Sequence, residues 1–348
     1  MHGWIILDKP LGLGSTQAVS AVKRALRSGG YAKAKVGHGG TLDPLATGVL
    51  PIAIGEATKL AGRMLDSDKA YAFTIRFGAQ TDTLDAEGQV IATSDVRPTA
   101  TALAAVLPRF TGPIAQVPPA FSALKVDGQR AYDLARAGEK VVLKTRDVVV
   151  HSLEVLPMPG MGRGTAAEGG GGGGNGAAGA DAPAPPPRPS GAVPLPIHDG
   201  EDHDLELEEA TLVASVSKGT YIRSLARDLA LALGMVGHVT MLRRLKAGPF
   251  DLAQAITLDK LAEFGQARTL EHLLLPLRAG LDDIPALSLT PDQAGALRQG
   301  RVLVGIAASD GAALATYRDT AVALVAVRNG EVRVERGFNL WNDVEEQT

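Results

Sequence analysis

The stretch from Gly37 to Leu50 gathers residue types that can carry out chemistry. It reads Gly-His-Gly-Gly-Thr-Leu-Asp-Pro-Leu-Ala-Thr-Gly-Val-Leu and places one carboxylate, Asp43, directly before Pro44. Proline fixes its own φ and favours an extended conformation in the residue before it, while glycines let a ligand or another backbone approach closely. Such a loop can hold Asp43 as a reactive carboxylate. Asp-Pro is also common at a helix start, with Asp as N-cap, so that structural role is an alternative.

A second constellation lies at Ser217–Arg223, which reads Ser-Lys-Gly-Thr-Tyr-Ile-Arg. Ile222 and Leu225 begin a series of apolar residues at helical spacing, which predicts that a strand ends and an amphipathic helix begins here. Tyr221 and Arg223 then lie within one turn of each other. Arginine is a planar, permanently charged donor that suits pairing with a carboxylate. An ordinary strand–helix junction with a solvated arginine is the alternative.

Tyr71 begins a run of alternating residues. In Tyr71–Phe77 the side chains of Tyr71, Phe73, Ile75 and Phe77 fall on one face of a predicted strand, because successive strand residues point to opposite faces. A tyrosine in this position can be a core aromatic. It can also offer an aromatic face and a hydroxyl to a ligand.

The loop pattern Gly-His-x-Gly-Thr-Leu-Asp-Pro-x-Ala-Thr-Gly closely resembles the catalytic motif of the TruB family, the bacterial tRNA pseudouridine-55 synthases. Shorter stretches agree with it: Leu-Asp-Lys-Pro-x-Gly near the N-terminus, Asp-Lys-x-Tyr at Tyr71, the polar turn Thr81–Gly88, and Ser217–Arg223. The resemblance implies an isomerase that converts uridine to pseudouridine at position 55, in the T arm of tRNA. The target base is stacked and paired there, so the enzyme must flip it out.

The resemblance also assigns roles to individual residues. Asp43 becomes the catalytic nucleophile, Arg223 its charge partner, and Tyr71 the residue that stacks on the uracil and is a candidate for taking the C5 proton. Attack of Asp43 at C6 of the base and at C1′ of the ribose both remain open. The expected substrate-binding residues are His38, which fills the space left by the flipped base, Tyr221, Leu242 and Lys9, together with Arg243 and Arg244 as candidate phosphate ligands.

Two alternatives compete with this function. An RNA-binding chaperone of the tRNA elbow, without essential catalysis, would not require the combination of Asp43, Tyr71, Tyr221 and Arg223. A synthase acting on other RNAs would share the chemistry and differ only in its substrate. For Lys9 and His38, structural roles in a turn and in a loop are further alternatives.

Composition limits the chemistry. The chain has 348 residues, 45% hydrophobic and 21% charged, and no cysteine, so disulfides and thiolate metal sites are excluded. The acidic turn Thr81–Gly88 lacks the ligands and the length of an EF-hand, and we predict no metal. Isomerisation requires no redox partner or group donor, so no cofactor is expected.

The absence of a leader and of a membrane-length apolar run predicts a cytoplasmic protein without membrane partners. A monomer is expected.

Charge is distributed unevenly around the net value of −3. Residues 1–65 hold eight Lys and Arg against three acids, and residues 218–250 hold six against one. Residues 199–209 carry seven acids and no Lys or Arg. The chain can therefore present a basic face to a phosphate backbone despite its negative total.

The elements that must position these residues indicate an α+β protein. We predict strands at Trp4–Leu7, Val49–Ile54, Tyr71–Phe77, Val148–Leu156 and Leu205–Ser217, with helices from Ser15 or Thr16 as cap, at Glu56–Leu65, Thr99–Phe110, Arg130–Lys140 and after Gly219. By resemblance they form a pseudouridine synthase fold over 1–285, with a central mixed or antiparallel sheet flanked by helices. A capped helix from Thr290 and a hairpin turned at Asn329-Gly330 predict a small β-rich, PUA-like RNA-binding domain over 286–348.

One segment departs from the family pattern. Residues 160–200 contain 13 Gly and 7 Pro in 41 residues, a composition that cannot bury enough apolar surface to offset chain entropy. We predict a disordered insertion at about 157–204, placed between two strands and away from the motifs.

Overall fold

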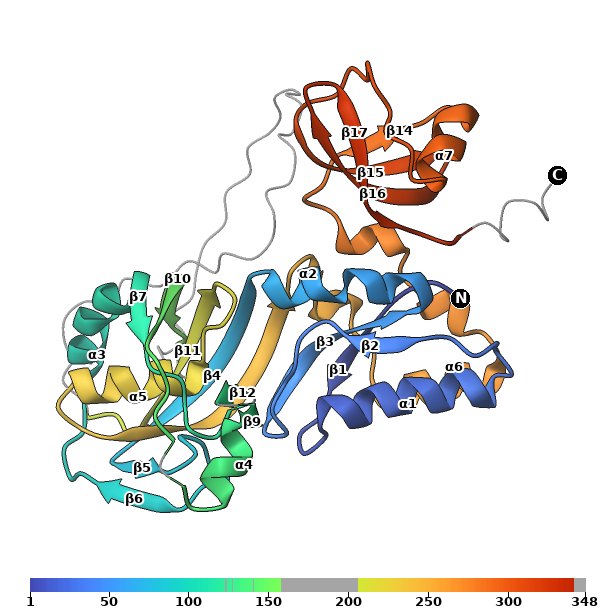
Figure 1. Cartoon of the computed structure of the whole chain (residues 1–348). Helices are drawn as coiled ribbons and strands as arrows, with labels where there is room; N and C mark the ends of the chain where they lie inside the picture. Colours follow the sequence, from blue (N-terminus) through green and yellow to red (C-terminus); the bar gives the residue numbers. More distant parts are fainter. Residues whose placement is uncertain (123, 127, 140, 158–205, 341–348) are drawn as a thin grey trace, which may run out of the picture.

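A large mixed sheet forms the body of the molecule (Figure 1). The computed structural model describes residues 1–157 and 206–340, apart from 123, 127 and 140. The main path of this sheet runs β1-β3-β12-β4-β11-β10-β7, with β2 and β13 paired at its side, and helices cover it. This arrangement confirms the predicted α+β class. The predicted insertion falls, apart from its first residue, outside the described residues.

The first part of the chain builds one end of the sheet. β1 (Gly3–Lys9) pairs antiparallel with β3 (Ala46–Ile54). β2 (Val36–His38) pairs antiparallel with the last three residues of β3, Ile52–Ile54. Between them, α1 (Ser15–Ser28) buries Ala18, Val19 and Val22 against this end of the sheet.

The cap of α1 differs from the prediction. Gly14 is the N-cap, and its N–H donates to the side-chain oxygen of Gln17 at 2.8 Å. Ser15 is buried instead: its hydroxyl accepts from the Leu42 N–H at 2.8 Å and lies 3.0 Å from the Leu42 carbonyl. The serine hydroxyl therefore ties the helix start to the loop that carries Asp43.

β12 (Gly237–Ala247) joins the two ends of the sheet. It runs parallel to β3 and antiparallel to β4 (Lys69–Phe77), with register shifts after Val239 and after Arg244. Beyond β4 follow β11 (Glu209–Val216), β10 (Arg146–Val155) and β7 (Gly112–Gln116), all antiparallel. α5 (Ile222–Ala232) packs on β4 and β12.

Short helices replace three of the longer ones expected. The helix predicted at Glu56–Leu65 is a 3₁₀ turn, Gly55–Leu60, followed by α2 (Ala61–Asp66). The buried residues of the first turn, Ala57 and Leu60, are three apart, which is the repeat of a 3₁₀ helix. α3 (Ala100–Val106) likewise continues as a 3₁₀ turn, Leu107–Phe110, and the basic helix is only α4 (Ala131–Arg136).

The remaining elements of this part are short. They are β5 (Ala79–Thr81), β6 (Val90–Thr93), β8 (Lys125–Val126), β9 (Gln129–Arg130), β13 (Phe250–Asp251) and α6 (Leu258–Ala267), with 3₁₀ turns at Leu252–Gln254, Leu270–Leu273 and Leu277–Gly280. β5 pairs with β6, and β8 with β9, in two small sheets of their own. α6 packs along α1 (Figure 1). No helix within the described ranges is both long and apolar enough to cross a bilayer.

A separate four-stranded sheet follows residue 285. Its order is β14 (Ala286–Ser288), β15 (Gly311–Tyr317), β16 (Thr320–Arg328) and β17 (Glu331–Gly337), and α7 (Pro291–Arg298) packs on it. The predicted hairpin is present, with φ of 49° at Asn329 and 75° at Gly330. Two positive φ values suit the tight turn between twisted strands.

The two sheets share a buried cluster. Leu314, Leu324 and Phe338 of the C-terminal part pack in the same cluster as Trp4 and Ile6 of β1. A second, larger cluster on the other side of the main sheet is formed with α1, α5 and α6. The C-terminal sheet therefore rests directly on the core beneath β1 and β3.

Candidate active site

Four chain segments form most of the lining of a cavity of about 300 Å³. They are the Asp43 loop, the first residues of β4, the junction between β11 and α5, and the middle of β12. Of the residues predicted from sequence, the cavity brings together Asp43, Tyr71, Tyr221, Arg223, Leu242 and Arg244. His38, Lys9 and Arg243 lie outside its lining.

Asp43 and Arg223 form the ion pair that the sequence predicted. Arg223 Nη2 donates to Asp43 Oδ2 at 2.8 Å, although the two residues are 180 positions apart. The arginine side chain is 7% exposed and that of the aspartate 45%. Asp43 lies in a turn closed by the Ala46 N–H on its carbonyl, and no helix starts there. The N-cap alternative is therefore wrong.

A buried carboxylate that sequence reasoning missed holds the other side of Arg223. Arg223 Nη1 donates to Asp85 Oδ2 at 3.0 Å and to the Thr83 carbonyl at 2.8 Å, and its Nη2 also reaches the Phe121 carbonyl at 3.0 Å. Asp85 is 4% exposed. The sequence indicates that the turn Thr81–Gly88 agrees with the family pattern and is not a calcium loop, but it assigns no role to Asp85. The signal that could have identified Asp85 is its position in a stretch that agrees with the family pattern.

Arg244 lies beneath the Asp43 loop. Its guanidinium donates to the carbonyls of Val49 at 2.7 Å, Gly40 at 3.2 Å and Thr41 at 3.3 Å, and the residue is 1% exposed. A Cβ on Gly48 would lie 2.2 Å from the Arg244 carbonyl, so only glycine permits this approach. The burial contradicts the predicted phosphate contact of Arg244, because its donors serve the loop.

Lys9 supports the same loop from the end of β1. Its ammonium donates to the carbonyls of Leu13 at 2.6 Å, Pro10 at 3.0 Å and Pro44 at 3.2 Å. Burial lowers the pKa of Lys9 to about 8, against the opposing effect of the Asp43 charge. The lysine is fully buried and contacts the site through the loop backbone.

The aromatic and apolar walls come from two strands and a helix start. Tyr71 is half-buried on β4 and Leu242 is buried on β12. Tyr221 is the N-cap residue of α5, and the Gln116 side chain holds its backbone with bonds of 2.8 and 3.2 Å. Burial raises the pKa of the Tyr221 hydroxyl. The cavity therefore offers two tyrosines and a leucine beside one carboxylate.

His38 and Arg243 take positions at the edge of this arrangement. His38 ends β2, and its buried Nδ1 has no hydrogen-bond partner among the described residues. Burial, followed by the nearby Arg244 charge, lowers its pKa. Arg243 pairs with Asp8 at 2.8 Å and keeps a side chain that is 35% exposed.

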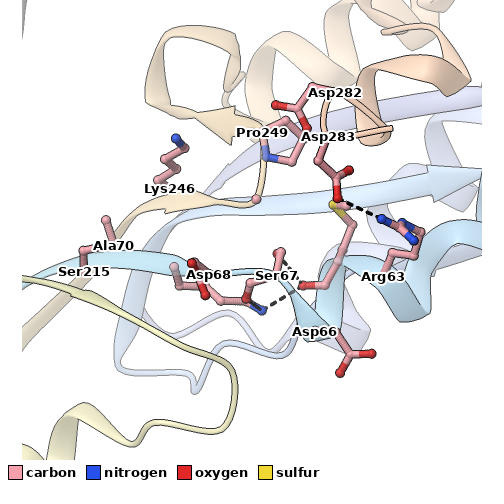
Figure 2. Close-up of a pocket in the computed structure, with 13 residues that line it drawn as sticks. Arg63, Asp66, Ser67, Asp68, Ala70, Ser215, Lys246, Pro249, Asp282 and Asp283 are labelled. Carbon is pink, nitrogen blue, oxygen red and sulfur yellow. Dashed lines mark hydrogen bonds and ion pairs between the residues drawn. The ribbon is translucent and has the colours of Figure 1, made fainter. Parts of the chain in front are cut away.

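A second hollow of about 610 Å³ adjoins the first and shares Lys69 with it (Figure 2). Charges of both signs line it. Arg63 and Asp283 pair across it at 2.9 Å, while Asp66, Asp68 and Asp282 add three carboxylates. The Lys69 ammonium donates to the carbonyls of Met64, Leu65 and Ser67 and so closes the C-terminal end of α2.

Two family models match the chain. The TruB family pseudouridylate synthase N-terminal domain matches residues 27–163, and the tRNA pseudouridylate synthase B C-terminal domain matches residues 223–282. The tRNA pseudouridine synthase B of Novosphingobium aromaticivorans is 57% identical, over 99% of this chain and 100% of that protein. The tRNA pseudouridine synthase B of Zymomonas mobilis is 52% identical, over 97% of this chain and 96% of that protein.

Solved structures show the same fold at lower identity. The archaeal box H/ACA sRNP Nop10–Cbf5 complex aligns with a TM-score of 0.62 and 22% identity, covering 97% of this chain and 86% of the other. An H/ACA RNP bound to a substrate RNA containing 2′-deoxyuridine aligns with a TM-score of 0.63, also at 22% identity, covering 97% and 85%. At this identity the likeness concerns the fold alone.

Proposed function

This chain belongs to the TruB family of pseudouridylate synthases and isomerises uridine to pseudouridine in tRNA, and from that premise we propose that it modifies uridine 55 in the T arm with Asp43 as nucleophile. The observation that carries the proposal is the 2.8 Å pair between a half-exposed Asp43 and a buried Arg223. Asp43 Oδ2 accepts from the guanidinium. The carboxylate also lines the cavity, so an attacking oxygen lies where a base can enter.

The chemistry balances within the substrate itself. Asp43 attacks C6 of the uracil or C1′ of the ribose, the C1′–N1 bond breaks, and the base rotates so that C5 bonds to C1′. The bond to Asp43 breaks again, either when C5 displaces the carboxylate from C1′ or by elimination from C6. N1, which has lost its bond to C1′, gains a proton and so balances the proton that C5 loses. The C5 proton then leaves to a general base, for which the Tyr71 hydroxyl is the candidate. Arg223 orients the carboxylate because a planar guanidinium held by Asp85 and two backbone carbonyls cannot rotate away.

The remaining residues of the site fit the handling of a flipped base. A uracil removed from its stack needs an aromatic face, which Tyr71 supplies, and apolar walls, which Tyr221 and Leu242 supply. His38 ends β2 just before the loop glycines, and we assign to it the role of filling the space that the base leaves. Arg243 has a partly exposed side chain for a phosphate contact.

The proposal extends to the organisation of the protein. Residues 1–285 form the catalytic domain, because every residue proposed for the site lies there. The sheet over 286–340 is the described part of a PUA-like RNA-binding domain that recognises tRNA beyond the T stem-loop. One chain supplies the complete set of Asp43, Tyr71 and Arg223, so a monomer acting in the cytoplasm suffices.

Tritium release tests the activity and its position together. A tRNA transcript carrying 5-³H-uridine should release tritium stoichiometrically with the modified position. A second transcript, in which only the T-arm target uridine is replaced by cytidine, should release none. Equal release from both transcripts would contradict the assignment to position 55.

The role of Asp43 is tested by Asp43→Asn. Asparagine keeps the size of the side chain and can still accept from Arg223, but it cannot act as the attacking carboxylate. We expect no pseudouridine formation and a Kd for tRNA close to wild type, because phosphate contacts elsewhere carry binding. Mass spectrometry must exclude deamidation back to aspartate. Turnover by the intact Asp43→Asn variant at saturating tRNA would rule out the nucleophile.

A further inference from the structure

An RNA-binding enzyme needs cations that are available to phosphates, and the cations of the catalytic site are already bonded. Arg223 and Arg244 are buried and donate to carboxylates and carbonyls, and Lys9 gives its three donors to the loop backbone. Arg243 pairs with Asp8. The phosphate contacts that supply most of the affinity for a nucleic acid must therefore come largely from other surfaces.

A basic cavity of about 740 Å³ lies at the outer end of α1. Its rim carries Lys23 and Arg27 from α1 and Lys33 and Lys35 from the connection to β2, and no acid lines it. All four of these side chains are exposed, and none forms an ion pair with another residue in the described ranges. Leu26, Ala34, Val36 and Tyr31 also line it, and the Tyr31 hydroxyl donates to the exposed carboxylate of Glu271 beside the cavity.

The cavity at the end of α1 suits a polyanion better than the hollow in Figure 2 does. That hollow also contains cations, but Asp66, Asp68, Asp282 and Asp283 surround them, and Arg63 is already paired with the last of these. A phosphate entering there would meet like charge. The cavity at the end of α1 offers four uncompensated cations around a concave surface, which is the arrangement a phosphate backbone requires.

The position of this cavity relative to the reaction follows from α1. The helix begins at Ser15, whose hydroxyl bonds Leu42 beside Asp43, and it ends at Ser28. The cavity residues of α1, from Lys23 to Arg27, come eight to twelve residues after Ser15, which at about 1.5 Å each places them roughly 12–18 Å along the helix from the Asp43 loop. In Figure 1 the connection from α1 to β2 lies at the end of the molecule opposite α3 and β7. A nucleotide in the catalytic cavity cannot also fill this one.

We propose that the cavity formed by Lys23, Arg27, Lys33 and Lys35 binds the sugar–phosphate backbone of the substrate tRNA, at a stretch remote from the target uridine. The inference rests on the proposed function for the identity of the RNA. It predicts a binding contribution without a catalytic one, because no residue of the cavity approaches the reacting atoms. The backbone can belong to the T stem or to another arm of the tRNA.

The test is the fourfold variant Lys23→Gln/Arg27→Gln/Lys33→Gln/Lys35→Gln, assayed with full-length tRNA and with the isolated T stem-loop. We expect the Kd for tRNA to rise about tenfold or more at 0.1 M salt, and the slope of log Kd against log salt to flatten by about two or more. Turnover at saturating tRNA should stay within about twofold. Unchanged Kd and salt slope for full-length tRNA would overturn the proposal.

The two RNAs distinguish the source of the phosphates. Weakened binding of both RNAs assigns the cavity to the T stem, and weakened binding of tRNA alone assigns it to another arm. Binding is measured independently of turnover. If wild-type protein released no tritium while the variant still lost affinity, the proposed function would fail and the binding surface would stand.

A matched pair of double variants controls for net charge. Lys33→Gln/Lys35→Gln removes two cations from the cavity, and Arg76→Gln/Arg109→Gln removes two exposed cations, without ion pairs in the described ranges, from β4 and from the turn after α3. Only the first should weaken tRNA binding. An equal loss in both would show a general charge effect and overturn the assignment. Thermal unfolding of each variant confirms that the exposed substitutions leave the fold intact.

Discussion

At the scale of single residues, the candidate active site combines buried charged side chains with one exposed carboxylate. Arg223 lies between two carboxylates, of which Asp85 is buried and Asp43 is half-exposed. A buried pair fixes the guanidinium in place, and the exposed partner remains accessible to a substrate. Lys9 and Arg244 hold the Asp43 loop from below through backbone carbonyls. Asp43, the proposed nucleophile, is therefore the one charged group of this set that solvent, and hence a base, can reach readily.

Tyr71 tests the proposed contact with the base. Tyr71→Phe keeps the aromatic face and removes the hydroxyl, so tRNA should still bind while turnover falls by about 10²-fold or more, as expected for loss of a proton-transfer group. Tyr71→Leu also loses the stacking surface and should turn over more slowly still. Single-turnover kinetics at saturating tRNA measure both. Near-normal turnover by Tyr71→Leu would return Tyr71 to the role of a core aromatic.

Lys9 links the site to pH. Its pKa is about 8 in the folded protein against 10.5 unfolded, so between these values the unfolded state holds more protons, and the free energy of unfolding rises with pH. Turnover should fall as the pH rises, because the neutral Lys9 amine has only two N–H donors for three carbonyls and holds Pro44 less firmly.

Urea unfolding and turnover, each measured from about pH 7 to about pH 10, separate these two effects. Lys69, whose pKa is also lowered to about 8, contributes stability of the same sign. The difference between wild type and Lys9→Met isolates the share of Lys9. A stability difference that is constant across this range would contradict the expected titration.

At the scale of elements, the site depends on β12 and on the start of α5. β12 runs parallel to β3 and antiparallel to β4, and so joins the strand after the Asp43 loop to the strand that carries Tyr71. Gln116, at the end of β7, reaches the first residue before α5 and satisfies both backbone groups of Tyr221. Edge strand and helix are thereby joined at the wall of the cavity.

Gln116→Ala tests this connection. The change leaves the Tyr221 N–H without its partner, while the Tyr221 carbonyl still accepts from the Leu225 N–H, and the loss should cost about 1–3 kcal/mol of stability. Because Tyr221 lines the cavity, we expect turnover to fall several-fold with little change in Kd for tRNA. Gln266→Ala on the exposed face of α6 is the matched control and should be neutral. Equal effects of the two substitutions would argue against a positioning role for Gln116.

The whole molecule is held together by the cluster that the two sheets share. Leu314, Leu324 and Phe338 pack with Trp4 and Ile6, and Lys59 donates to the Gly337 carbonyl at 2.9 Å beside them. The C-terminal sheet therefore covers apolar surface that the catalytic part would otherwise expose. Its attachment fixes the relative position of the two parts, and with it the surface over which a tRNA can extend.

Phe338→Ala measures that attachment. The side chain is 3% exposed, and its loss should lower the free energy of unfolding by about 3–5 kcal/mol, as for other buried phenylalanines. Val304→Ala, at a side chain that is 74% exposed in the same C-terminal part, should change it by less than about 0.5 kcal/mol. Chemical denaturation compares the two variants. A small effect of Phe338→Ala would show that the shared cluster contributes little.

Local patterns in the sequence determined much of this protein. Alternation in Tyr71–Phe77, the cap at Thr290 and the Asn329-Gly330 turn each depend on neighbouring residues, and the structure has all three. The Asp43 motif indicated the family and the pairing of Asp43 with Arg223. These signals are local or carried by a long motif, so the sequence alone displays them.

Only the tertiary structure decided which charges are buried. Arg243 and Arg244 are adjacent in sequence, yet one pairs with Asp8 at the surface and the other is enclosed under the Asp43 loop. Strand residues point alternately to opposite faces, and which face is covered depends on segments about two hundred residues away. The same reason explains why Asp85 was missed, since its partner Arg223 is 138 positions distant, and why Ser15 bonds Leu42 rather than capping its own helix.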